Sequence, residues 1–80
     1  MDDKNIMEQI NHLVEEEHEL LTQESRGAIN DPGRERMRAL EVQLDQLWDL
    51  LRQRRARRDF GGNPDEAEVR PADIVETYDQ

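Results

Sequence analysis

The chain has 80 residues, of which 39% are charged, and its formal net charge is −9. Only 34% of the residues are apolar and none is a cysteine, which excludes disulfides, a thiol nucleophile and cysteine-based zinc sites. This length and composition predict one small domain built from helices that are solvent-exposed on one side, rather than a domain with a sheet-based core. The acidic start Met1-Asp2-Asp3 and the lack of a long apolar run predict a cytoplasmic protein without a membrane span.

The first predicted element is a helix over residues 3–25. At about 100° per residue its apolar side chains share one face, namely Ile6, Ile10, Leu13, Val14, Leu20 and Leu21. Arg26-Gly27 indicates its end, because glycine readily adopts the left-handed conformation that closes a helix.

Two acidic features of this helix are candidates for chemistry. Glu15 and His18 form the Glu-x-x-His pattern of di-iron four-helix bundles, but the helical wheel places both away from the apolar stripe. We therefore expect solvated side chains there and no metal or other cofactor. Glu17 and Glu24 lie on the stripe, where a carboxylate fixes register or pairs with a cation.

The second predicted helix covers residues 32–59, capped by Asn30 or Asp31 with Pro32 at its first position. Its apolar side chains recur in steps of three and four, namely Met37, Leu40, Leu44, Leu47 and Leu51. The short connection between the two helices predicts an antiparallel hairpin, and therefore an all-α fold.

A lone hairpin would leave part of this apolar surface exposed to solvent, because Trp48 and Leu50 widen it beyond the heptad positions. We expect two hairpins to pair as a homodimer with coiled-coil packing in a four-helix bundle. The predicted oligomer interface consists of Leu40, Leu44, Leu47, Trp48 and Leu51.

The last turns of the second helix carry a dense cluster of positive charge, which is the only feature of the sequence that could recognise a ligand by charge. The cluster consists of Arg52, Arg54, Arg55, Arg57 and Arg58. One interpretation is structural, because an antiparallel hairpin brings Asp2, Asp3 and Glu8 close to these arginines. The other is a docking site for an acidic partner, a phosphate or a nucleic acid.

The segment after the hairpin, residues 61–80, is acidic and contains Pro64 and Pro71. We predict a hairpin domain over residues 1–60 and a largely disordered tail over residues 61–80. Within this tail, residues 63–66 favour one short helical turn, and a small apolar cluster follows, consisting of Ile74, Val75 and Tyr78.

Several stretches together resemble a family of roughly 80-residue actinobacterial proteins of unknown function. The longest runs from Leu44 to Arg58, and the others are Val14-Glu15-Glu16-Glu17-His18, Asn63-Pro64-Asp65, Val69-Arg70-Pro71 and Val75-Glu76 with Tyr78. A cysteine is common in that family where this chain has Leu47, so a thiol role in relatives does not transfer. The resemblance implies a small helical protein and supplies no activity.

Two functions follow from these patterns, and neither is enzymatic. The first is a homo-oligomeric adaptor that presents the arginine-rich helix end to an acidic protein partner, with its own acidic tail able to imitate that partner. The alternative is a nucleic-acid accessory protein that uses Arg52 to Arg58 and is gated by the tail. The net charge of −9 argues against nucleic-acid binding, because the overall field repels phosphate.

Overall fold

The computed structural model describes the backbone of residues 2–78 and the side chains of residues 2–75. Two long helices, α1 (Asp3–Ser25) and α2 (Asp31–Asp59), are followed by the 3-10 turn η1 (Pro64–Glu66) and the short helix α3 (Ala72–Tyr78). Residues 2–78 contain no strand, so the prediction of an all-α protein with two long helices is confirmed. None of these helices is both long and apolar enough to cross a bilayer.

Local capping explains where the long helices begin and end. Asn30 accepts a hydrogen bond from the Gly33 backbone N–H at 2.8 Å, so α2 begins at Asp31, one residue earlier than predicted. Gly27 (φ 70°) and Gly61 (φ 78°) follow the two helix C-caps. In both places the residue after the glycine donates to a carbonyl five residues earlier, which is the Schellman pattern.

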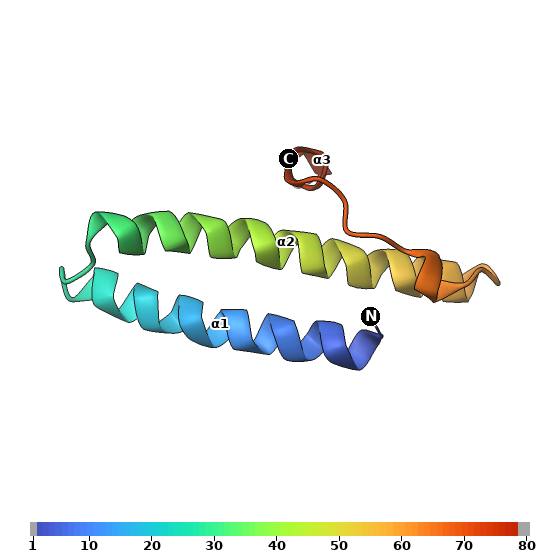
Figure 1. The fold of residues 1–80 in the computed structure, drawn as a ribbon, viewed down its shortest axis with the longest axis horizontal. Helices are drawn as coiled ribbons and strands as arrows, with labels where there is room; N and C mark the ends of the chain where they lie inside the picture. Colours follow the sequence, from blue (N-terminus) through green and yellow to red (C-terminus); the bar gives the residue numbers. More distant parts are fainter. Residues whose placement is uncertain (1, 79–80) are drawn as a thin grey trace.

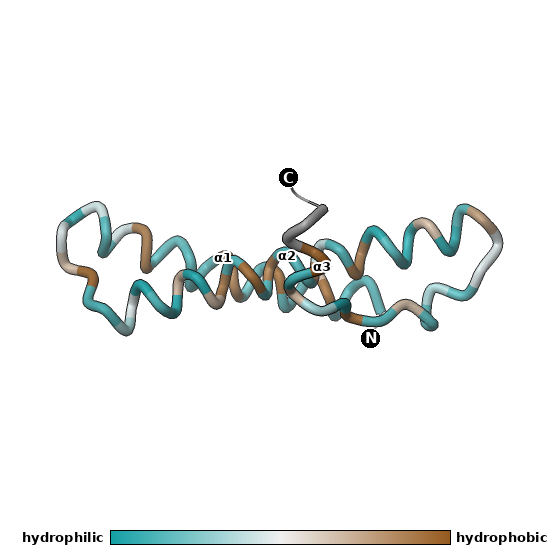
Figure 2. Tube along the Cα trace, turned by 90° about the horizontal axis from the view of Figure 1, so that it is seen from above, coloured by the Kyte–Doolittle hydropathy of each residue, from teal (hydrophilic) through white to brown (hydrophobic). Residues whose placement is uncertain are grey.

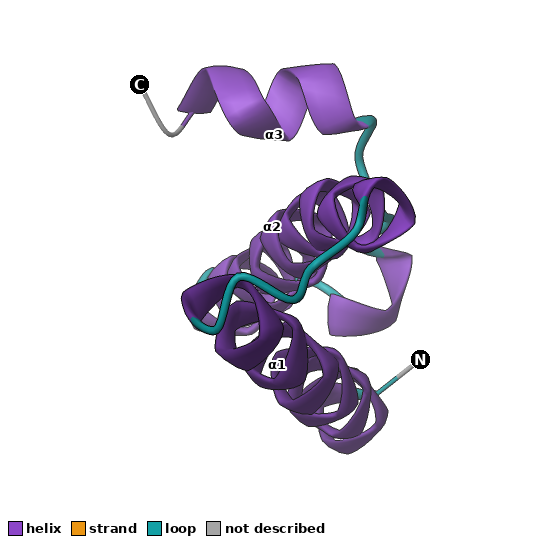
Figure 3. Ribbon diagram, turned by 90° about the vertical axis from the view of Figure 1, so that its left-hand side faces the viewer, coloured by secondary structure: helices purple, strands orange, loops and turns teal. Residues whose placement is uncertain are grey.

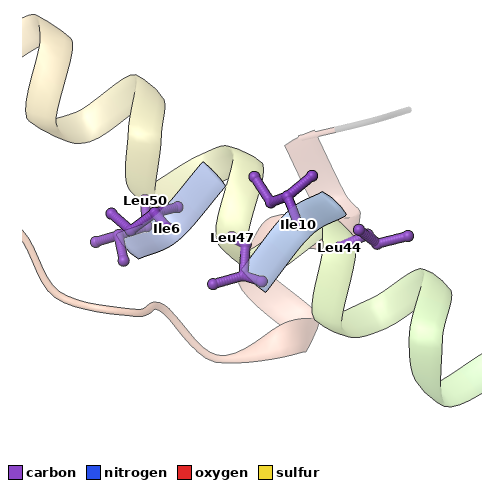
Figure 4. Close-up of a cluster of buried hydrophobic side chains, with 5 residues drawn as sticks. All are labelled: Ile6, Ile10, Leu44, Leu47 and Leu50. Atoms are coloured by element: carbon purple, nitrogen blue, oxygen red, sulfur yellow. The ribbon is translucent and has the colours of Figure 1, made fainter. Parts of the chain in front are cut away.

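The core of the hairpin is a narrow seam between α1 and α2, which lie side by side (Figure 1). Figure 2 shows that apolar positions recur between hydrophilic ones along both helices. Ile6 and Ile10 of α1 pack against three leucines of α2 (Figure 4), namely Leu44, Leu47 and Leu50. Because this seam buries few large side chains, the hairpin depends strongly on each of them.

The acidic segment differs from the predicted disordered tail. After η1 the chain returns along α2, and α3 lies across α2 on the side away from α1 (Figures 1 and 3). Val75 is only 1% exposed and Ile74 is 43% exposed, while the side chain of Tyr78 lies outside the described residues. Composition alone missed this arrangement because a few specific hydrogen bonds and one apolar side chain hold the segment.

Candidate interaction site at the arginine-rich end

The five predicted arginines share one helix end but have different surroundings. Arg54 continues the heptad of the leucines, so it points into the seam and is 6% exposed. Arg52 and Arg55 are exposed and form no ion pair with the described residues. The cluster is therefore two surfaces, one engaged within the molecule and one open.

Arg54 is the centre of the engaged surface. Its Nε donates to Asp3 Oδ1 at 2.5 Å, and its Nη1 donates to Asp65 Oδ1 at 3.0 Å and to the Pro64 carbonyl at 3.1 Å. A buried guanidinium needs such acceptors, because an unpaired charge is costly away from water. Arg54 thus joins the start of α1, the end of α2 and η1.

Asp3 holds two arginines at once, since Arg58 Nη1 donates to its second oxygen at 2.6 Å. The hydrogen bonds from Arg54 and Arg58 lower the pKa of the Asp3 carboxyl. The hydrogen bond that Arg54 donates to Asp3 is also the main cause that raises the pKa of Arg54. This confirms the expected proximity of Asp3 to the arginines, whereas Asp2 caps α1 by accepting from the Asn5 N–H at 2.8 Å.

The returning segment covers α2 through contacts that the sequence analysis did not identify. Arg70 donates to both oxygens of Asp49, at 2.7 and 2.9 Å, and Asp49 is 3% exposed. Gln53 donates to the same carboxylate at 2.9 Å and to the Glu68 carbonyl at 2.8 Å. Gln46 donates to the Arg70 carbonyl at 3.2 Å. We call these four residues (Gln46, Asp49, Gln53 and Arg70) the tail latch.

One sequence signal could have predicted the latch. Gln46, Asp49 and Gln53 are spaced by three and four residues, so they share a helix face. That face points away from the leucine seam, and Arg70 is the only cation in the segment after the hairpin. A buried acid with two amide neighbours on one helix and a lone arginine on the next segment are complementary in charge and hydrogen bonding.

The residues of the predicted oligomer interface are largely used inside one chain. Leu40, Leu44 and Leu47 are at most 8% exposed, and Leu51 is half-buried against the same seam. Trp48 alone among the five is exposed, at 42%.

The candidate metal ligands Glu15 and His18 are both exposed. Within the described part of the chain, no group of three or more His, Cys, Asp or Glu side chains could hold a metal ion. An open groove of about 620 Å³ runs between the long helices on the side of the tail. It is lined by polar side chains of α1 and α2 and by the apolar side chains of Leu13, Leu47 and Val69.

These features define a small helical hairpin protein whose arginine-rich end is partly covered by its own C-terminal segment. The family model described as protein of unknown function (DUF2630) matches residues 2–80, so the chain belongs to this family. The resemblance drawn from the sequence is thereby confirmed.

The chain is similar to two mycobacterial proteins, "Uncharacterized protein Rv0898c" of Mycobacterium tuberculosis (strain H37Rv) and "Uncharacterized protein Mb0922c" of Mycobacterium bovis. Each is 49% identical over 77 residues, which cover 95% of this chain and 88% of the relative. No solved structure matches the chain significantly.

Proposed function

We propose that this protein is a non-enzymatic, homo-oligomeric interaction module of the cytoplasm that presents the end of α2 to an acidic protein segment. The supporting observation is the bond from Arg54 to Asp65, because a carboxylate of the chain's own tail already occupies a guanidinium of the cluster. Arg57 has a similar but longer contact with Glu66, at 3.4 Å. The tail thus imitates an acidic ligand, and Arg52 and Arg55 at the same helix end are open to a partner.

Competition between tail and partner gives this module its regulation. The tail is tethered a few residues from the arginines, so its carboxylates act at a high effective concentration even though each exposed ion pair is weak. An external acidic segment must contact Arg52 and Arg55 first and then displace Asp65 and Glu66. Binding should consequently be salt-sensitive and should strengthen when the tail loses these charges.

The test uses full-length protein and a fluorescent poly-glutamate peptide at low salt. We expect the Asp65→Asn/Glu66→Gln variant to bind it about three- to tenfold more tightly than wild type, by fluorescence anisotropy. The matched control is Asp59→Asn/Glu68→Gln, which removes the same charge from exposed acids without ion pairs to described residues. Equal strengthening by both variants would mean that net charge alone governs binding, which contradicts competition by the tail.

The specific contribution of the open arginines is tested by Arg52→Gln/Arg55→Gln, which should weaken peptide binding about tenfold. The alternative function, a nucleic-acid accessory protein, has less support, because three of the five arginines already pair with carboxylates. A mobility shift with single-stranded DNA that exceeds peptide binding and is lost in this arginine variant would favour that alternative instead.

A further inference from the structure

The tail makes two charged contacts with α2 that lie five residues apart on both segments. Asp65 accepts a hydrogen bond from Arg54 at 3.0 Å, and Arg70 donates to both oxygens of Asp49 at 2.7 and 2.9 Å. The partners follow one another forward along the tail and backward along α2, so the tail returns antiparallel to α2 (Figure 1). The contact at η1 and the tail latch therefore belong to one continuous bound segment.

The residues between these two contacts are also held by α2. Arg57 donates to Glu66 at 3.4 Å, and Gln53 donates to the Glu68 carbonyl at 2.8 Å. No long free stretch of chain therefore separates η1 from Arg70. A change at the tail latch should consequently be felt at η1.

The two ends of this segment are held with different strength. The side chains of Asp65 and Glu66 are 75% and 67% exposed, and ion pairs so exposed are weak and screened by salt. The Asp49 side chain is only 4% exposed, and Arg70 binds it through two charge-assisted hydrogen bonds. Opening this pair would leave a buried carboxylate without its cation, which is costly. The tail latch is therefore the stronger attachment.

We propose that the tail latch is an autoinhibitory lock that controls access to the arginine-rich end. While the Asp49–Arg70 pair is closed, it holds η1 against Arg54 and Arg57. When the pair opens, η1 leaves more often and an acidic partner segment can take its place. This rests on the proposed function and adds a control point five residues away from Arg54 along α2.

The physical reason is how η1 is tethered. With the latch closed, η1 is anchored on both sides, by the end of α2 before it and by Arg70 after it. With the latch open, only the end of α2 anchors it, so the effective concentration of its carboxylates at the arginines falls. Arg54 Nη1 then loses both of its η1 acceptors, Asp65 and the Pro64 carbonyl, and a partner carboxylate can replace them.

The first test measures binding of the fluorescent poly-glutamate peptide to full-length protein in variants that break the pair from either side. Arg70→Gln makes the protein more acidic and Asp49→Asn makes it less acidic, so net charge alone predicts opposite changes in affinity. We expect both variants to bind about three- to fivefold more tightly than wild type, because both open the latch. The double variant should bind no more tightly than the better single variant, since one substitution already breaks the pair.

The matched control is Arg38→Gln. It removes the same charge from an exposed arginine of α2 that forms no ion pair with the described residues. This variant should bind the peptide no more tightly than wild type. Tighter binding by Asp49→Asn together with weaker or unchanged binding by Arg70→Gln would follow charge alone and would overturn the proposal.

A second measurement needs no partner, so it separates failure of the latch from failure of the proposed function. Nuclear magnetic resonance relaxation reports the backbone order of Asp65, Glu66 and Ala67 in the free protein. In Arg70→Gln we expect their order parameters to fall from about 0.85 toward 0.6, while those of α1 stay unchanged. Unchanged order in η1 overturns the control by the latch even if wild type binds the peptide. Reduced order in a protein that fails to bind the peptide supports the latch and contradicts the acidic partner.

Discussion

At the scale of single residues, position along α2 decides what each arginine can do. Arg54 lies seven residues after Leu47 and three after Leu51, so its stem lies in the seam and its guanidinium is held by acceptors. Arg55 is the next residue, yet it is turned away by about 100° and is exposed. Composition suggests a uniform basic patch at this helix end. Helical geometry instead buries Arg54, which has a structural role, and leaves Arg55 accessible.

Because the seam is short, each buried isoleucine contributes a large part of the stability. Ile10 is 1% exposed, and Ile10→Ala should lower the free energy of unfolding by about 2–4 kcal/mol. Urea denaturation at one fixed protein concentration, followed by far-ultraviolet circular dichroism, measures it. Val69→Ala, at an exposed valine, should stay within about 0.5 kcal/mol. Equal losses in both variants would contradict the assignment of the core.

At the scale of elements, the sequence predicted the hairpin closely because its signals are local. The apolar period defines each helix, and Asn30, Gly27 and Gly61 fix the ends through their own hydrogen bonds or backbone conformation. The segment after Gly61 was predicted poorly because its order is not local. The order of this segment depends on the pairing of Arg70 with Asp49, which lies 21 residues earlier. Pairings between residues so far apart produce no periodic pattern in the sequence.

The same reasoning applies to the candidate site. The arginine cluster and its proximity to Asp3 follow from two antiparallel helices, and both could be predicted. Which arginines remain open depends on where η1 and its carboxylates come to lie, which the helical pattern does not specify. How much of the leucine surface the seam within one chain buries is a tertiary property, so the helical pattern could not specify it, and the predicted oligomer interface stays a prediction.

The tail latch makes a prediction at this scale. Asp49→Asn keeps the size of the side chain but removes the charge that holds Arg70, so the segment from Glu68 to Val75 should detach from α2 more often. We expect amide hydrogen exchange in that segment to accelerate at least about tenfold, while exchange in the α1 core stays within about twofold. Asp59→Asn, an exposed acid at the end of the same helix, is the control. Unchanged exchange near Arg70 would show that the Asp49–Arg70 pair does not hold the segment.

At the scale of the whole molecule, α2 is the central element, with α1 on one side and the returning segment on another. Ion pairs join α1 to α2 at two levels, through Asp3 at the start of α1 and through the Glu16–Arg36 pair beyond its middle. The apolar seam of Ile6 and Ile10 with the leucines of α2 lies between these pairs. The long helices are thus joined by charge on either side of this seam and by apolar contact within it.

This arrangement predicts how stability responds to acid. Hydrogen bonds from the arginines lower the pKa values of Asp3 and Glu16 below their ordinary values of 3.8 and 4.5. A carboxyl whose folded pKa is lowered contributes stability that is fully present above its unfolded pKa. That contribution is lost as the pH falls through the folded pKa. The contribution of these two groups should therefore be constant above about pH 5 and should disappear progressively below pH 4.

The relief of charge repulsion between other acids changes over the same pH range, so the comparison must be between variants. Wild type should be more stable than Asp3→Asn at pH 6, and the two should converge as the pH falls well below 3.8, by urea denaturation at each pH. Glu16→Gln should converge with wild type in the same manner, starting nearer pH 4.5. A stability difference that stays constant from pH 6 to pH 2.5 would mean that the lost interaction is packing rather than charge. In that case the ion pairs of Asp3 with Arg54 and Arg58 would not stabilise the contact between the start of α1 and the end of α2.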